Sequence, residues 1–249
     1  MQKQSLITAL LLALSITGFA QECTTECNTL TPHGWSFDLG GQYTWLSFTT
    51  PPTFKGSTGG AQARITYQEP DAFFGQLRSV YNSGTLSSSI TKSVDKEWYS
   101  EFVAGYCFSP DSCWAFTPYV GFGVDFLNDH KSAYSTFSAI TLRYRTYYAL
   151  FGFDARYFLE DWSFGLQAEG LPICQQYLSI GGLPGAAWTM NRHIGAAVRL
   201  PIGYSVTEKL SLELAPYYRF FPIGASSVLL LPERILNQWG AFVTLRFSI

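Results

Sequence analysis

The chain alternates between apolar and polar residues near both of its ends, and a period of two is typical of β-strands with two unlike faces. Residues 35–45 place Trp, Phe, Leu, Gly, Tyr and Trp on one face and Ser, Asp, Gly, Gln and Thr on the other. Residues 238–249 alternate in the same way. Eight more strands are predicted near 60–68, 72–82, 97–108, 114–126, 139–157, 162–171, 189–204 and 209–221. The pattern predicts about ten strands, or eight if the weak hairpin at 60–82 is misread.

The connections between these strands alternate in length. Short turns are predicted at 69–71, 109–112, 159–161 and 205–208. Long loops are predicted at 50–59, 83–96, 127–138, 172–188 and 222–236. Short periplasmic turns and long outer loops are typical of outer-membrane barrels. We therefore expect an all-β fold, a transmembrane antiparallel up-and-down β-barrel, and an even strand number places both termini in the periplasm.

The competing fold is a soluble barrel or sandwich, which turns its apolar face inward and a lysine-rich face to water. Two observations argue against the soluble fold. The lysines after residue 20 fall in predicted loops or at strand ends, and only 14% of residues are charged while 17% are aromatic. Trp35 and Trp45 are ten residues apart, which in tilted strands spans roughly 25 Å, the height of a lipid-facing band. The polar face carries charges of both signs, which we expect in the lumen: Asp38, Arg64, Arg78, Glu101, Asp125, Asp154, Arg156, Glu169, Arg199, Glu213, Arg219 and Arg246.

The first residues predict export. Lys3 precedes an apolar run at 6–16 that ends near Gly18 and Ala20, as in a cleaved signal peptide. We divide the chain into a signal peptide (1–20), a periplasmic N-terminal segment (21–34) and one outer-membrane barrel (35–249). No other apolar run is long enough for a membrane-spanning helix.

Few partners and no cofactor are predicted. The formal net charge of −2 and the absence of a basic run argue against nucleic acid. No nucleotide-binding glycine loop, zinc-type cysteine pairs or nucleophile elbow is present, so no cofactor or metal is expected. Outer-membrane lipids are the expected surroundings. The alternating C-terminal strand, ending Leu-Arg-Phe-Ser-Ile, resembles the signal read by the barrel-insertion machinery, with Ile249 in place of the usual Phe.

Five cysteines in an exported chain suggest disulfides. Cys107 and Cys113 flank a predicted periplasmic turn, where a bridge would pin one hairpin. Cys23 and Cys27 lie in the N-terminal segment, in the same oxidising compartment, and Cys174 falls in a long outer loop. Spacing alone leaves the pairing open, and buried or free thiols are the alternative.

The motif Cys23-Thr24-Thr25-Glu26-Cys27, placed before a first strand rich in Trp, Gly and Tyr, resembles the N-terminal segment of the chlamydial and Legionella major outer membrane proteins. The resemblance covers some thirty residues. It implies a porin-like barrel in which Cys23 and Cys27 form disulfides with other envelope proteins or within a homo-oligomer.

Two rival functions follow from other residues. An outer-membrane hydrolase would draw on Asp125, Asp129, His130, Ser132 and His193, and His130-Lys131-Ser132 is similar to the His-x-Ser of lipid A deacylases. Solvated loop residues are the simpler interpretation of this set. A hydrophobic-ligand barrel would use the apolar segments 171–188 and 222–236. We favour the interpretation that these segments cover the barrel mouth.

The function that the sequence favours is non-enzymatic: a structural or narrow porin-like outer-membrane barrel. Any solute passage would be governed by the twelve lumen charges. Ten strands enclose a narrow lumen, because eight are just filled by side chains. Low conductance is expected, or none if the charges pair fully.

Overall fold

The computed structural model describes residues 34–49, 53–89, 91–111, 113–133, 139–181, 187–225 and 233–249. The predicted signal peptide and the N-terminal segment up to residue 33, with Cys23 and Cys27, lie outside this set. The strands are β1 (Gly34–Phe48), β2 (Phe54–Gln68), β3 (Phe73–Ser87), β4 (Lys92–Tyr106), β5 (Phe108–Asp111), β6 (Trp114–Lys131), β7 (Ile140–Leu159), β8 (Trp162–Ile180), β9 (Ala187–Thr189), β10 (Ile194–Arg199), β11 (Ile202–Thr207), β12 (Leu210–Ile223) and β13 (Arg234–Ser248). No helix in the described part of the chain is long and apolar enough to cross a membrane.

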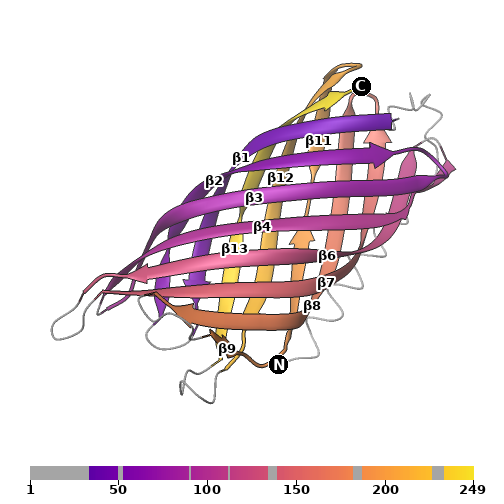
Figure 1. The fold of residues 1–249 in the computed structure, drawn as a ribbon. Coiled ribbons are helices and arrows are strands. Elements are labelled where there is room, and N and C mark those ends of the chain that lie inside the picture. Colours follow the sequence, from indigo (N-terminus) through magenta and orange to yellow (C-terminus); the bar gives the residue numbers. More distant parts are fainter. Residues whose placement is uncertain are drawn as a thin grey trace, which may run out of the picture.

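These strands form one closed antiparallel barrel (Figure 1). Long strands that follow one another along the chain pair with each other, and β1 pairs with β13, from Ser36 opposite Ser248 to Phe48 opposite Leu236. The two short strands β5 and β9 only extend the pairing of β6 and β8, and β10 and β11 share one position between β8 and β12. The wall therefore has ten positions, and the predicted ten-stranded barrel is confirmed.

The division between β10 and β11 has a local cause. Pro201 has no backbone N–H and so cannot donate to a neighbouring strand. Its carbonyl still accepts from Gly165 N at 2.7 Å, and Leu200 N donates to Pro216 O at 2.9 Å. Both halves pair with β8 and β12, so the wall stays closed across the break.

The two ends of the barrel differ. One end, which we call the turn end, has the short connections at 69–72, 112–113, 160–161 and 208–209. The backbone of Asp71 and Glu160 there is left-handed, with φ near 50°, as tight turns require. Ile249 N donates to Trp35 O at 2.9 Å, so the first and last strands also begin and end at the turn end. The opposite end, the loop end, holds the other connections (Figure 1).

The strands reach further toward the loop end than the sequence predicts. The expected loops at 50–59, 83–96, 127–138, 172–188 and 222–236 are partly strand, because β2, β3, β4, β6, β8, β12 and β13 continue into them. In parts of these extensions the pattern inverts. The outward residues become polar, such as Lys55 and Lys96, while inward residues such as Phe54 and Leu86 are apolar and buried. A barrel wall that leaves lipid for water is expected to invert in this way.

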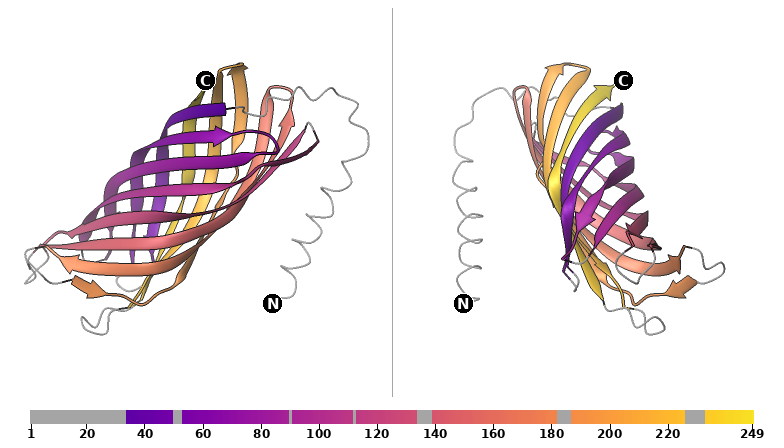
Figure 2. Two further views of the ribbon diagram at one scale, coloured as in Figure 1. Left: turned by 45° about the vertical axis from the view of Figure 1, so that its right-hand side comes forward. Right: turned by 90° about the vertical axis from the view of Figure 1, so that its left-hand side faces the viewer.

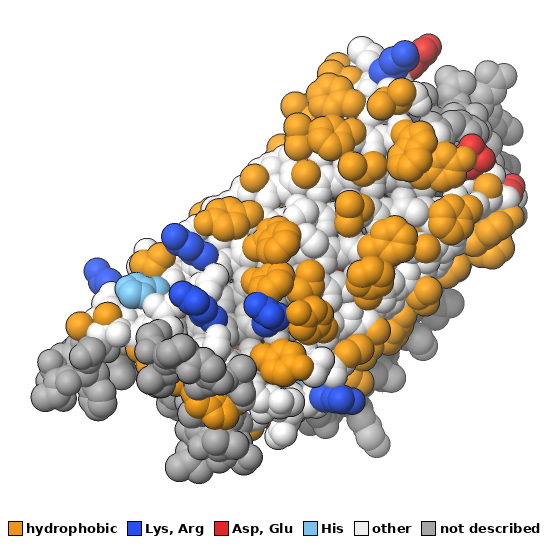
Figure 3. Space-filling view, viewed as in Figure 1, with side chains coloured by type: hydrophobic (Ala, Val, Ile, Leu, Met, Phe, Trp, Pro, Cys, Tyr) orange, Lys and Arg blue, Asp and Glu red, His pale blue; other side chains and the backbone are white. Residues whose placement is uncertain are grey.

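Figure 2 shows the barrel wall from two further sides, and on the face drawn in Figure 3 the waist of the outer surface is apolar. Aromatic pairs mark both edges of this band. Toward the turn end the ring centroids of Trp35 and Tyr67 are 5.1 Å apart, and toward the loop end those of Trp98 and Phe126 are 5.2 Å apart and stacked. Aromatic girdles at both edges of an apolar band are typical of barrels that cross a membrane.

Candidate functional site: the barrel interior

All twelve charges predicted for the lumen form ion pairs inside the barrel. The alternation of each strand turns them inward, and closure brings strands distant in sequence face to face. The pairs are Asp38 with Arg64 and Arg246, Arg64 with Glu213, Arg78 with Glu101 and Glu169, Arg156 with Asp154 and Glu213, Glu169 with Arg199, Arg219 with Asp125, and Glu213 with Arg246. They occupy successive levels, described below from the turn end upward.

The level nearest the turn end centres on two carboxylates. Asp38 lies opposite Arg64 on β2 and Arg246 on β13 in the strand register, and pairs with both. Glu213 of β12 reaches across the interior to Arg64 at 3.0 Å, Arg156 at 3.2 Å and Arg246 at 3.4 Å. These five side chains therefore tie together β1, β2, β7, β12 and β13.

The middle level joins the two opposite walls. Arg78 of β3 pairs with its register neighbour Glu101 of β4 and lies 3.6 Å from Glu169 of β8. Glu169 also pairs with Arg199 of β10 at 3.1 Å. The hydroxyl of Tyr148 donates to Glu101 at 2.7 Å. Each of these charges is at most 7% exposed, so this level is closed to bulk water.

The third level centres on Arg219 of β12, which is 2% exposed. Its guanidinium is 2.9 Å from both Glu97 and Asp125, on β4 and β6. The rings of Tyr99 and Phe221 lie 4.5 and 4.4 Å from its Cζ, within the range of cation–π contacts. The buried charge of Arg219 is thus held by two carboxylates and two aromatic rings.

Near the loop end two further carboxylates face inward. The hydroxyl of Ser93 lies between Asp95 and Asp129, 2.7 Å from Asp95 Oδ1. Lys131 is 3.5 Å and Arg234 3.8 Å from Asp129 Oδ2. Among the described residues, no group of three or more His, Cys, Asp or Glu side chains is placed to hold a metal ion.

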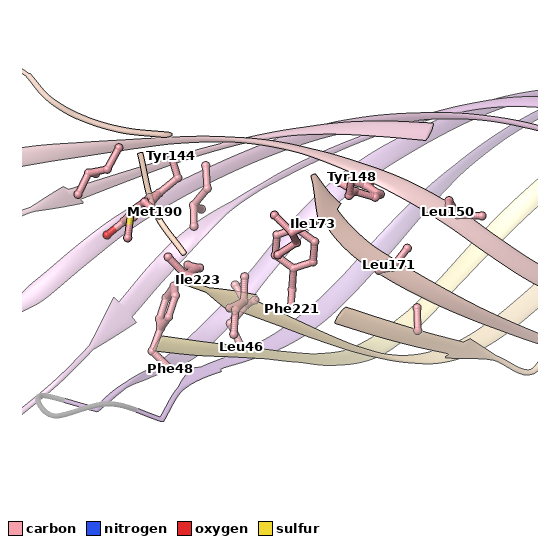
Figure 4. Packing of buried hydrophobic residues seen from close by; sticks show 14 of the residues in the cluster. Leu46, Phe48, Tyr144, Tyr148, Leu150, Leu171, Ile173, Met190, Phe221 and Ile223 are labelled. Atoms are coloured by element: carbon pink, nitrogen blue, oxygen red, sulfur yellow. The ribbon is translucent and has the colours of Figure 1, made fainter. Parts of the chain in front are cut away.

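The interior at the loop end is closed by apolar side chains (Figure 4). Leu46 and Phe48 of β1, Phe221 and Ile223 of β12, and Tyr144 of β7 point toward one another from different walls (Figure 4). Residues from the apolar segments of the sequence belong to the same buried cluster: Leu171, Ile173, Leu178, Ile223 and Leu236. The inward-facing residues of both segments therefore pack inside the barrel at the loop end. Residues 182–186 and 226–232 lie outside the described set.

Two cavities between these layers, lined by described residues, are small. A cavity of about 10 Å³ lies among Thr58, Asn82, Asp95 and Glu97, and another of about 10 Å³ lies near Arg78 and Arg199. Such a volume is about that of a single water-sized probe. A larger cavity of about 430 Å³ opens at the turn end, where Arg156, Glu213 and Arg246 form its inner wall. This cavity is a vestibule, and the first level of ion pairs forms its inner end.

The residues considered for hydrolysis are not brought together. Asp125 and Asp129 are buried inside the barrel, whereas His130 is exposed on the outside, with Nδ1 2.8 Å from Thr141 Oγ1. Ser132 is exposed beyond the end of β6, and His193 lies near Glu233, 3.5 Å away. Alternation along β6 accounts for the separation of Asp129 from His130, because consecutive residues face opposite sides.

The bridge between Cys107 and Cys113 that the sequence suggested does not form. Cys107 is a free, fully buried thiol packed with Ala115 and Phe158, and accepts a hydrogen bond from Gln68 Nε2 at 3.4 Å. It therefore forms no bridge to Cys113. The reason is that the strand wall continues past Cys107 as β5, which directs the thiol inward rather than across the turn. Cys174 is free and exposed.

Five inward charges are additional to the twelve predicted: Asp95, Glu97, Asp129, Lys131 and Arg234. Asp95 and Glu97 stand at steps of two from Glu101 and therefore share its face of β4. That alternation is the signal that could have found them. The predicted strand begins at residue 97, so its pattern includes Glu97 and stops short of Asp95.

The structure can be compared with solved proteins. It superposes on the outer membrane protease OmpT from Escherichia coli with a TM-score of 0.58 and 8% identity, covering 88% of this chain and 98% of that one. The translocator domain of the autotransporter NalP from Neisseria meningitidis gives a TM-score of 0.49 and 8% identity over 99% and 98% of the two chains. Ail of Yersinia pestis gives 0.38 and 10% over 86% and 99%.

No protein-family model matches the sequence, and no curated protein is similar enough to count as a relative. The resemblance to the chlamydial and Legionella proteins accordingly gains no support from these comparisons. At this low identity the superposition on OmpT establishes the fold alone. The chain has the fold of an outer-membrane β-barrel.

Proposed function

We propose that the protein is a sealed, structural β-barrel of the outer membrane, with both termini in the periplasm. The observation that supports this most is the filled interior. Ion pairs join opposite walls at three levels, and an apolar cluster closes the loop end above them. Crossing such an interior would require buried charges to separate, which costs several kcal/mol for each pair.

A porin-like role differs from this one only in whether ions pass. It would need a connected path beyond the 430 Å³ vestibule, and the charges that were expected to line such a path bind one another instead. The complete pairing of the twelve charges therefore favours the sealed version over the conducting one.

Ligand binding in the mouth and hydrolysis receive less support from the geometry. A hydrophobic ligand would occupy the mouth, where Phe48, Tyr144 and Ile223 already pack together (Figure 4). Hydrolysis would need an accessible acid or base with a positioned partner. Asp125 and Asp129 are each 3% exposed, and the hydrogen-bond partner of the exposed His130 is the hydroxyl of Thr141 rather than a carboxylate. We therefore propose a non-catalytic role. Kinship with the chlamydial and Legionella proteins, and disulfide links through Cys23 and Cys27, remain predictions about residues outside the described set.

Planar-bilayer recording at neutral pH tests the proposal. The purified, folded protein is expected to give no steady ion current. Sustained single-channel steps from the unaltered protein would overturn the sealed interpretation and favour the narrow pore.

A pair of variants shows whether the side chains form the seal. Replacing Phe48, Tyr144 and Phe221 by alanine together with Arg219→Ala and Glu97→Ala empties the interior at two adjacent heights, so small currents are expected. The matched control removes aromatic bulk from the lipid side instead, with Tyr43→Ala, Tyr81→Ala and Phe122→Ala, since these three side chains are 47–65% exposed on the outer face. The control should remain silent.

A further inference from the structure

The outer surface of the barrel is polarised by charge. In the turns of the turn end lie Glu69, Asp71, Glu160, Asp161 and Glu208, against Lys209. Toward the loop end the exposed charged residues are Lys55, Lys92, Lys96, Arg143, Arg145 and Arg192, and among the described residues only Glu233 opposes them. On the face drawn in Figure 3, most Lys and Arg side chains accordingly lie toward the lower left, near the loops. The loop end therefore presents a basic rim.

A groove of about 630 Å³ lies within this rim, on the outer side of β6, β7 and β8. The strand register arranges its walls in three rows. The row nearest the loop end holds, in order across the strands, Asn128, Arg143 and Ser179. The next row holds Phe126, Arg145 and Tyr177. Tyr147 and Gln175 form the lowest row. The groove thus passes from hydrogen-bond donors at its upper edge to aromatic rings at its lower edge.

The two arginines of the groove have no acidic partner. Neither Arg143 nor Arg145 forms an ion pair with any described residue, and no carboxylate lines the groove. Arg145 is exposed and lies over the Phe126 ring, with its Cζ 5.4 Å from the centroid. Arginine at the lipid face is costly at mid-membrane and nearly free of cost at the interface, so its position at the girdle is suited to an anionic headgroup.

The surface below the groove is suited to acyl chains. Phe122 is 65% exposed, Val120 66% and Phe151 55%, all on the outer side of β6 and β7. A ligand that spans both regions would place an anion against Arg143 and Arg145 and its apolar part along these residues. Guanidinium groups bind phosphate through two parallel hydrogen bonds, whereas lysine acts as a point charge.

We propose that the groove between Arg143 and Arg145 is a binding site for the phosphorylated headgroup of an outer-leaflet glycolipid. The site goes beyond the structural role proposed above. It rests on the proposed orientation of the loop end toward the outer leaflet and does not depend on whether the interior is sealed.

Native mass spectrometry of the folded protein in detergent tests this site with three probes: diphosphorylated lipid A, the same lipid with both phosphates removed, and inorganic phosphate. The unaltered protein should retain diphosphorylated lipid A and bind the dephosphorylated lipid at least about tenfold more weakly. Equal retention of the two lipids would overturn the proposal. Equally tight binding of inorganic phosphate would also overturn it, by showing a general anion site.

Variants locate the site. Arg143→Gln with Arg145→Gln should weaken lipid A binding roughly tenfold or more. Lys92→Gln with Lys96→Gln removes the same charge from β4, outside the groove, and should change it by less than about twofold. Arg143→Lys with Arg145→Lys keeps the charge without the forked donors, and its affinity for lipid A should lie between those of the unaltered protein and the double glutamine variant.

Heat-modifiable migration on gels reports whether each variant folds. If the double glutamine variant fails to fold, the single Arg143→Gln variant and the dephosphorylated lipid test the site instead. Equal effects of the groove and β4 variants would contradict the proposed location.

Discussion

Arg219 is the residue on which the third level of the interior depends. Changing it to methionine keeps much of the volume but leaves the buried carboxylates of Glu97 and Asp125 without their cation. We expect a loss of about 3–5 kcal/mol in the free energy of unfolding, as for one partner removed from a buried pair. Urea unfolding in lipid vesicles, followed by tryptophan fluorescence, measures it.

The control for this prediction removes all three charges at once. Arg219→Met with Glu97→Gln and Asp125→Asn leaves no uncompensated charge, so its stability should return to within about 1–2 kcal/mol of the unaltered protein. A single variant that is as stable as the unaltered protein would show that this level is solvated, contrary to the sealed interior.

Gly123 is needed because the side chain of Tyr148 lies close to its backbone and leaves no space for a Cβ atom. A Cβ atom at this position would lie 2.4 Å from Cζ and 2.6 Å from the hydroxyl oxygen of Tyr148, the side chain that donates to Glu101. Gly123→Ala should therefore lower the free energy of unfolding by about 1–3 kcal/mol, the usual cost of overpacking. Gly41→Ala is the matched control, because its nearest neighbour would be the Gly60 carbonyl at 3.8 Å. Equal effects at both sites, in the same urea assay, would argue against this packing.

At the scale of elements, alternation is sufficient to predict the strands that cross the apolar waist. It fails in the extensions toward the loop end because the pattern inverts there. Phe54 and Leu86 are apolar like Trp35 and Trp45, but they face inward rather than outward. The alternation of apolar and polar residues does not say which face of a strand points into the barrel. Where the apolar face changes from outside to inside, the alternation is interrupted and the strand seems to end. The pattern therefore predicts apolar loops where the structure has strand extensions.

The sequence also does not show which way the Cys107 side chain points, and this is why the predicted bridge to Cys113 is wrong. The positions of the cysteines in the structure lead to a new prediction. Cys107 is enclosed and Cys174 lies on the outer wall near Gln175 of the groove, so neither is placed to bridge Cys113. Cys113 lies at the turn end, where β1 also begins, and Cys27 is seven residues before Gly34, which an extended chain spans over roughly 23 Å. In the oxidising periplasm we expect Cys113 to pair with Cys23 or Cys27.

Peptide mapping without reduction checks this pairing. The expected product joins the peptide of Cys113 to one from the N-terminal segment, and Cys107 should react with an alkylating reagent only after unfolding. A linked peptide of Cys107 and Cys113 would contradict the prediction.

For the whole molecule, the alternation of short and long connections in the sequence is sufficient to predict ten strands. The pairing of β1 with β13, which closes the barrel, agrees with this number. The contacts across the interior do not follow. Glu213 and Arg64 are 149 residues apart along the chain, and Arg219 and Glu97 are 122 apart. Both separations are far larger than any within a predicted hairpin. Which charges meet depends on the stagger of the strands around the barrel. That stagger is a property of the closed fold and is not visible along the chain.

The orientation of the whole barrel is a final prediction. The acidic turn end with both termini is expected in the periplasm, and the basic loop end should face the outer leaflet. In a background with every cysteine changed to serine, Glu233→Cys marks the loop end and Glu160→Cys the turn end; both residues lie in connections outside the waist. A membrane-impermeant maleimide applied to intact cells should label the Glu233→Cys variant, and the Glu160→Cys variant only after the outer membrane is permeabilised. The reverse pattern would turn the barrel over, and it would place the Arg143 and Arg145 groove against the periplasmic leaflet, where the glycolipid proposal would fail with it.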